Sequence, residues 1–213
     1  MLHIRPHKLF DLLSPEIPER LVQIKLPFRT ENYLIETALL LAAGKIVGAR
    51  RIFEFGTFRG ATTLNLALNF PGAEIFTFDL APELAGSVKQ DHYHAAISRQ
   101  HFETDTMEFN SAKHGARIQR IEDESLRFDS SQYHGSMDLV FVDGGHDHAT
   151  LDADTRNAFL MAPNGCIAWH DYDNPEYPDV KQFLDALNKP VFHVEESRMC
   201  FWFASPSLVS RLE

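Results

Sequence analysis

One stretch decides the fold, and it reads Arg51-Ile-Phe-Glu-Phe-Gly56-Thr-Phe-Arg-Gly60-Ala-Thr-Thr-Leu-Asn-Leu-Ala-Leu68. Its first five residues are mostly large and apolar, which is typical of a buried strand. From Ala61 onward the pattern predicts a helix, and two glycines lie between the two elements. A strand that leads through a glycine-rich turn into a helix is the repeating unit of a parallel α/β sheet.

The same alternation continues toward the C-terminus. Further strands are predicted at 74–79, 117–122, 137–143, 166–170, 191–195 and 199–203, with helices at 150–161 and 180–187. Strands that alternate with helices predict a mostly parallel sheet covered on both faces. The short connection between the last two strands makes the final strand antiparallel. We therefore expect an α/β protein with a doubly wound, seven-stranded, mostly parallel sheet and an antiparallel last strand.

The chain is predicted to divide into two parts. Residues 1–44 form an N-terminal arm, partly helical and partly irregular, because four prolines interrupt its first 30 residues. A helix in this arm is expected to close at Gly44 and Gly48. Residues 45–213 form the cofactor-binding catalytic domain, in which the polar segment 80–115 is irregular and could cover the site. The arm could cap the site or form the contact of a homodimer, and the sequence leaves both open.

Composition excludes several classes of function. Twenty Lys and Arg residues against thirty Asp and Glu give a net charge of −10, which repels nucleic acid and anionic lipid. The most apolar stretch, residues 33–49, is interrupted by Glu36 and Lys45 and is too short and too charged to span a membrane. Two cysteines exclude a disulfide-rich scaffold. We expect a soluble cytoplasmic protein that acts on a small molecule and has no nucleic-acid or membrane partner.

The predicted ligand site lies beyond the carboxyl ends of the strands, where parallel sheets bind their ligands. Gly56 and Gly60 allow the backbone to approach a ligand closely, and the helix that follows offers free N–H groups. Asp79, after the second strand, is well placed to accept hydrogen bonds from a ribose. Asp123 or Glu124, after the third, could bind an exocyclic adenine amine. The dinucleotide fingerprint G-x-G-x-x-G is absent.

Four stretches resemble the class I S-adenosylmethionine-dependent methyltransferases over residues 51–203. They are Glu54-Phe-Gly-Thr-Phe-Arg-Gly-Ala-Thr-Thr63, Phe78-Asp79, Phe141-Val-Asp-Gly-Gly-His146 and Ala168-Trp-His-Asp-Tyr172. The last two resemble, more narrowly, a bacterial subfamily with D-G-x-H after the fourth strand and H-D-Y after the fifth. The resemblance implies S-adenosylmethionine as cofactor, with the two glycines beside its methionine part, Asp79 at the ribose and Asp123 at the adenine. The predicted cofactor-binding residues are Glu54, Gly56, Thr57, Gly60, Asp79, Asp123 and Asp143.

Charge supports the same cofactor independently of the family. S-adenosylmethionine is a sulfonium cation with a zwitterionic tail, so carboxylates around it suit its charge, whereas they would repel a pyrophosphate. Glu54 and Asp143 are therefore expected to meet its ammonium group.

Four acid and base side chains follow the fourth and fifth strands, namely Asp143, His146, His170 and Asp171. One possible chemistry is a divalent metal, Mg²⁺ or Mn²⁺, held by Asp143 and Asp171, the positions that match the ligands of catechol-type methyltransferases. The other is metal-free, with His146 or His170 as the general base. His170 stands where the catechol-type enzymes have a carboxylate, and it could also be a purely structural residue.

These observations predict a methyltransferase that transfers the methyl group of S-adenosylmethionine to an oxygen of a small molecule or sugar. Two other functions fit the same architecture. One is a nicotinamide-dependent oxidoreductase, and the other is a catalytically silent protein that only binds a cofactor.

Overall fold

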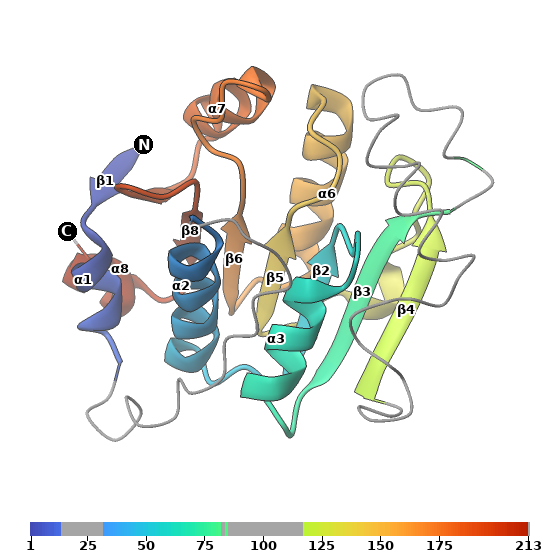
Figure 1. The fold of residues 1–213 in the computed structure, drawn as a ribbon, viewed down its shortest axis with the longest axis horizontal. Coiled ribbons are helices and arrows are strands. Elements are labelled where there is room, and N and C mark those ends of the chain that lie inside the picture. The colour runs from blue at the N-terminus through green and yellow to red at the C-terminus, as the bar shows by residue number, and fades with distance from the viewer. Residues whose placement is uncertain (14–31, 82–83, 85–116, 213) are drawn as a thin grey trace.

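The computed structural model describes residues 1–13, 32–81, 84 and 117–212. Its centre is an eight-stranded sheet in the order β1-β7-β8-β6-β5-β2-β3-β4. The strands are β1 (Leu2–Ile4), β2 (Arg51–Phe55), β3 (Glu74–Leu80), β4 (Ile118–Asp123), β5 (Leu139–Val142), β6 (Cys166–Trp169), β7 (Phe192–Val194) and β8 (Cys200–Phe203). Figure 1 shows the sheet face on.

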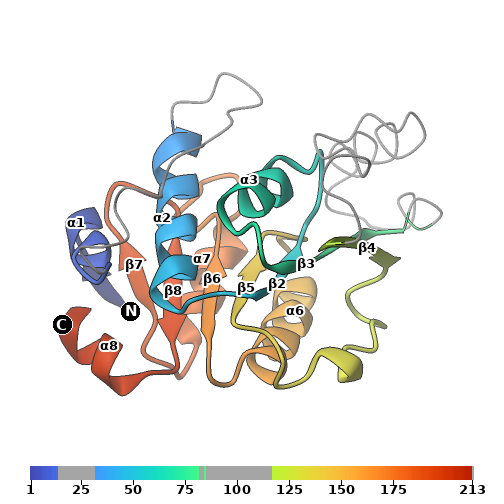
Figure 2. The ribbon, with the colours of Figure 1, turned by 90° about the horizontal axis from the view of Figure 1, so that it is seen from below.

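Helices cover both faces of this sheet, as Figure 2 shows from below. They are α1 (Pro6–Phe10), α2 (Asn32–Ile46), α3 (Ala61–Asn69), α6 (His148–Met161), α7 (Pro178–Ala186) and α8 (Pro206–Leu212), with a short 3₁₀ turn, η4 (Ser131–Tyr133). Apolar side chains of α2 and α3 join one core cluster, and those of α6 and α7 join the other. The doubly wound architecture predicted from the sequence is therefore confirmed.

Strand direction also agrees with the prediction. β2 pairs in parallel with β3 and β5, and β5 pairs in parallel with β6. β8 is antiparallel to both of its neighbours, β6 and β7. The carboxyl ends of β2, β5 and β6 therefore meet at one edge, which is the edge where the sequence places the site.

The predicted number of strands was wrong, because the sheet has eight and not seven. The additional strand is β1, which lies in the segment predicted to be a helical and irregular arm. It pairs in parallel with β7, with Leu2 opposite Phe192 and the Leu2 N–H bonded to the Val191 carbonyl at 3.1 Å. A strand of three residues shows no periodicity, so only its partner defines it.

Alternation of side chains along the strands separates the two cores. In β2, Ile52 belongs to the cluster beneath α2 and α3, while Phe53 and Phe55 belong to the cluster beneath α6 and α7. Successive residues of a strand point to opposite faces, so a strand buried on both sides is apolar almost throughout. In β2, Arg51 at the start of the strand is half-buried, and Glu54 is the one charged residue that is fully buried, on the α3 side.

The end of α2 differs from the prediction. Gly44 was expected to close this helix, but it lies inside it, and the helix continues to Ile46. A Cβ at residue 44 would come within 2.6 Å of the Phe70 ring, so this glycine serves close packing and not helix termination. Gly48, with φ of 62°, follows the helix end as predicted. The part of the chain that the structure describes holds no helix long and apolar enough to cross a membrane. The predicted irregular segment 80–115 lies almost entirely outside the described residues.

Candidate active site

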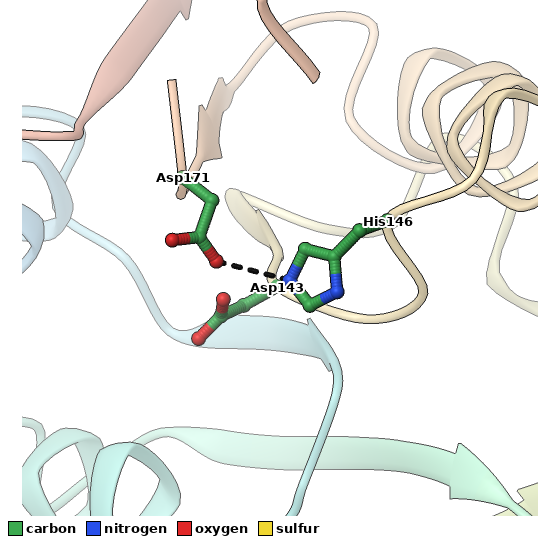
Figure 3. Close-up of side chains that lie close together, drawn as sticks. All are labelled: Asp143, His146 and Asp171. Carbon is green, nitrogen blue, oxygen red and sulfur yellow. Dashed lines mark hydrogen bonds and ion pairs between the residues drawn. The ribbon is translucent and has the colours of Figure 1, made fainter. Parts of the chain in front are cut away.

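The site is assembled by the ends of two neighbouring strands. Val142 and Trp169, the last residues of β5 and β6, are paired in register. Asp143 follows the first strand directly, and His170 and Asp171 follow the second. Figure 3 shows Asp143 and Asp171 together with His146, which comes from the loop between β5 and α6. The four residues predicted for the chemistry therefore lie together.

His146 is held on its edge and on its face. Its Nε2 lies 3.0 Å from Asp171 Oδ2, and Tyr177 stacks flat on the ring with centroids 3.6 Å apart and planes inclined by 7°. The second oxygen of Asp171 accepts a hydrogen bond from Asn174 Nδ2 at 2.6 Å. Burial alone would raise the pKa of Asp171, but the hydrogen bonds and charges of His146 and His170 hold it well below its usual range. Asp171 is therefore a carboxylate that orients His146.

His170 lies among three carboxylates. Its Nδ1 is 3.2 Å from both Asp143 Oδ1 and Asp171 Oδ2, and its Nε2 is 3.0 Å from Glu36 Oε2. Burial alone would lower the pKa of His170, but the charge of Asp143 and the hydrogen bonds to the carboxylates outweigh it and raise the pKa well above its usual value. The charged ring has a proton on each nitrogen and no lone pair with which to accept another. These surroundings suit a fixed cation better than the general base that the sequence offered as one role.

The turn between β2 and α3, residues 56–60, is called the glycine turn and packs against Asp143 of this cluster. Gly56 has φ of 95°, and a Cβ there would come within 1.9 Å of the Asp143 carbonyl oxygen. The N–H groups of Gly56 and Thr57 both donate to the Phe78 carbonyl, at 2.8 and 3.2 Å. Gly60, with φ of 78°, is the N-cap of α3. Only a residue without a side chain allows β2 to turn so close to the end of β5.

Asp79 joins the glycine turn to the end of β3. Its Oδ2 accepts the Phe58 N–H at 2.7 Å, and its Oδ1 accepts the Leu80 N–H at 2.8 Å. Asp123 pairs in register with Leu80, so it lies at the same edge of the sheet. The structure thus places Asp79 and Asp123 along one edge with Thr57, whose hydroxyl is 2.7 Å from that of Thr77.

Glu54 lies behind the turn and has no exposed surface. Its Oε2 accepts hydrogen bonds from the Thr63 and Thr77 hydroxyls, the second at 2.6 Å, and its Oε1 has no hydrogen-bond partner among the described residues. Burial raises the pKa of Glu54 to about 8, with a smaller contribution from the charges of Asp143 and Asp79 and against the two threonine bonds. Its predicted contact with an ammonium group stays a prediction.

Sequence reasoning missed Tyr177 and Asn174, described above, and two further residues of this site. Glu36, on α2, contacts His170, and Arg198, in the turn between β7 and β8, has a guanidinium nitrogen 3.7 Å from Asp171 Oδ1. A small pocket beside the cluster is lined by Glu36, Thr37, Leu40, Thr62, Phe141, Asp143, His170 and Met199. The signal that could have found Glu36 is its position as an acidic residue inside an apolar stretch.

The cluster also offers a set of metal ligands. Asp143, His146 and Asp171 each present one ligand atom, and these atoms lie within 4.8 Å of one another. Two carboxylate oxygens with one imidazole nitrogen suit Mn²⁺, Fe²⁺ or Zn²⁺ better than Mg²⁺, which prefers oxygen alone. The donor set therefore fits a divalent ion, with His146 as a third ligand beside the two aspartates predicted for it.

Comparison with known proteins agrees with this architecture. An S-adenosylhomocysteine-bound methyltransferase of Podospora anserina, PaMTH1, is 16% identical with a TM-score of 0.55, covering 94% of this chain and 88% of that one. The O-methyltransferase TomG of Streptomyces achromogenes, in complex with S-adenosylmethionine, is 17% identical with a TM-score of 0.51, covering 93% and 90%. A putative O-methyltransferase of Klebsiella pneumoniae is 19% identical with a TM-score of 0.52, covering 93% and 90%. These likenesses show a shared fold.

The family itself is shown by sequence. No curated protein matches the chain significantly. The family model described as a methyltransferase domain matches residues 53–172, more than half of the chain, from within β2 to just beyond the Asp171 cluster. The match includes the glycine turn, Asp79 and all four of the clustered acid and base residues. The chain therefore belongs to the methyltransferase domain family.

Proposed function

We propose that this methyltransferase transfers the methyl group of S-adenosylmethionine to an oxygen of a small molecule or sugar. The observation that carries the proposal is the convergence of Asp143, His146 and Asp171 beside the glycine turn, at the edge where parallel sheets bind their ligands. Two of the structural neighbours were determined with this cofactor or its demethylated product. The motifs Asp143-Gly-Gly-His146 and His170-Asp-Tyr172 support the narrower bacterial subfamily with D-G-x-H and H-D-Y.

The binding residues suit the parts of this cofactor. A carboxylate oxygen can accept two hydrogen bonds, so the bonds from Phe58 and Leu80 to Asp79 are compatible with further bonds from a ribose diol. Asp143 lines the pocket between α2 and α3, where its charge suits an ammonium group. Asp123, at the end of β4, is the residue that we assign to the adenine amine.

Methyl transfer requires an acceptor oxygen in line with the sulfonium and a base for its proton. The oxygen forms a bond to the methyl carbon, the carbon–sulfur bond breaks with its electrons going to sulfur, and the acceptor proton goes to the base. We assign this base to His146, because Asp171 accepts its Nε2 proton and Tyr177 holds its ring flat. A neutral ring in that tautomer has its lone pair on Nδ1, which takes the proton.

A divalent ion is the alternative use of the same residues. Bound to Asp143, His146 and Asp171, it would supply Lewis acidity that lowers the pKa of an acceptor hydroxyl. A neutral imidazole has only one lone pair, so His146 cannot bind a metal and act as the general base at the same time. Dependence of the rate on added Mn²⁺, with loss of activity in EDTA, would support the metal; an EDTA-resistant rate would support the metal-free base.

Titration calorimetry with S-adenosylmethionine and S-adenosylhomocysteine tests the proposal. We expect both to bind, and we expect Asp79→Ala to weaken binding while Asp152→Ala, which removes the same charge from the exposed face of α6, leaves it unchanged. NADH is added in a separate fluorescence titration, because its binding would favour the oxidoreductase instead. Absence of binding by both sulfur compounds at millimolar concentration would overturn the proposal.

A further inference from the structure

Glu36 connects three parts of the chain that are far apart in sequence. It lies on α2, before the residues 53–172 that match the family, and is only 6% exposed. Its Oε2 is 3.0 Å from His170 Nε2, and its Oε1 accepts the Arg198 N–H at 2.9 Å. We propose that Glu36 is a positioning residue of the active site, which fixes the His170 ring between Asp143 and Asp171. The inference rests on the proposed function of this edge of the sheet.

The His170 ring has carboxylate partners on both sides, through one hydrogen bond and two ion pairs. Its Nδ1 faces Asp143 and Asp171 at 3.2 Å each, which anchors one edge of the ring. Glu36 anchors the opposite edge through Nε2. An imidazole bound at both nitrogens cannot rotate about its χ2 torsion without breaking a bond to a carboxylate. Because Asp143 and Asp171 both contact this ring, their relative position depends on Glu36, a residue of α2.

The carboxylate of Glu36 is divided between two donors, and this division makes the position sensitive to conservative substitution. One oxygen serves His170 and the other serves the Arg198 backbone. Glutamine has the same length but one acceptor oxygen and an NH₂ group, so one of the two donors would face another donor. Glu36→Gln should therefore release either the ring or the β7–β8 turn without leaving a cavity.

The location of Glu36 distinguishes a positioning role at the site from a contact that only stabilises the packing of α2 on the sheet. Glu36 lines the pocket beside the cluster together with Asp143 and His170. A matched structural tie exists elsewhere: Asp138, just before β5, accepts the backbone N–H groups of Arg50 and Arg51 at 2.8 and 2.9 Å. It lies at the opposite end of β5 from Asp143, away from the site. Both bonds use Asp138 Oδ2, so Asp138→Asn removes a charge of the same kind while an asparagine carbonyl oxygen can still accept both N–H groups.

The experiment compares Glu36→Gln with Asp138→Asn in the full chain. Histidine ring signals are recorded in long-range ¹H–¹⁵N spectra at one neutral pH and assigned with His170→Gln and His146→Gln, and urea unfolding is measured in parallel. In Glu36→Gln we expect loss of the protected His170 Nε2–H signal and a shift of the His146 ring signals. In Asp138→Asn we expect both sets of signals to keep their wild-type positions.

Each outcome bears on the proposal. Unchanged His170 signals in both Glu36→Gln and Glu36→Ala, the second of which removes both acceptor oxygens, would overturn it. Equal changes in Asp138→Asn would also overturn it, because the effect would then be global. If Glu36→Gln fails to fold, Glu36→Asp provides the same readout, because it keeps the charge but shortens the side chain by one methylene group. Unchanged His170 ring signals in Glu36→Asp would also contradict the proposal. Calorimetry of the wild type with S-adenosylhomocysteine separates the two proposals, because failure to bind it would remove the proposed function and leave the ring result standing.

Discussion

The glycine turn offers the most quantitative test of how the site is built. Gly56→Ala adds one methyl group at a residue with φ of 95°. That methyl carbon would lie 1.9 Å from the Asp143 carbonyl oxygen and 2.5 Å from its carbonyl carbon. The shorter separation is about 1.5 Å less than an ordinary contact at 3.4 Å, and both atoms belong to the main chain. No side-chain rotation can relieve the overlap, so the turn and the end of β5 must separate.

Two costs contribute to the expected loss of stability. A left-handed conformation costs a residue with a side chain about 1–2 kcal/mol relative to glycine. Forcing an extra carbon into a packed site typically costs about 1–3 kcal/mol more. We therefore expect Gly56→Ala to lower the free energy of unfolding by about 2–5 kcal/mol. Because Asp143 moves with its carbonyl, binding of S-adenosylhomocysteine should weaken as well.

Two other glycines separate these costs. Gly48 has φ of 62°, and a Cβ at this residue would have nothing within 4 Å, so Gly48→Ala should show the conformational cost alone, about 1–2 kcal/mol. Gly72 has equally open space and no positive φ, so Gly72→Ala should be neutral or stabilising by up to about 1 kcal/mol. Urea unfolding at one pH and calorimetry with S-adenosylhomocysteine measure all three variants. If Gly56→Ala unfolds no more easily than Gly48→Ala and binds with wild-type affinity, the close packing of the turn against Asp143 is refuted.

Three further predictions concern single side chains. Asp79→Ala should weaken binding of S-adenosylhomocysteine by about 1–3 kcal/mol, measured by calorimetry, because a charged acceptor is lost; equal affinity would contradict its role at the ribose. Burial raises the pKa of Asp154 from 3.8 to about 8, so the folded state retains a proton that the unfolded chain releases, and the unfolding free energy should fall as pH rises through this window. In Asp154→Asn the unfolding free energy, measured by urea titration, should differ less between about pH 5 and pH 9 than in the wild type; an equal difference would contradict the raised pKa. Thr155→Val should cost about 1–3 kcal/mol in the same assay, because it leaves the buried Trp169 indole N–H, now 3.0 Å from the Thr155 hydroxyl, without an acceptor; an unchanged midpoint would contradict this.

Much of the fold could be predicted because the central strands carry their own signal. The middle residues of β2 and β3 are buried and mostly apolar, β5 is apolar throughout and lies between Asp138 and Asp143, and β2 ends just before Gly56. β1 carries no such signal, because its pairing with β7 depends on residues some 190 positions away. Gly44 was misassigned for a related reason: the Phe70 ring that it packs against comes from another element, and helix termination is the more frequent role of glycine near a helix end.

The candidate site shows the same division between local and distant information. Asp143, His170 and Asp171 could be predicted because strand direction alone brings the residues after β5 and β6 to one edge. Glu36 could not, because its contact with His170 exists only once α2 has docked on the sheet. A carboxylate inside an apolar helix nevertheless carries information, since burying a charge without a partner costs too much free energy to persist. Such a residue predicts a hydrogen-bond donor close to it in the folded protein. Here the donors are the His170 ring and the Arg198 backbone N–H, both at the site.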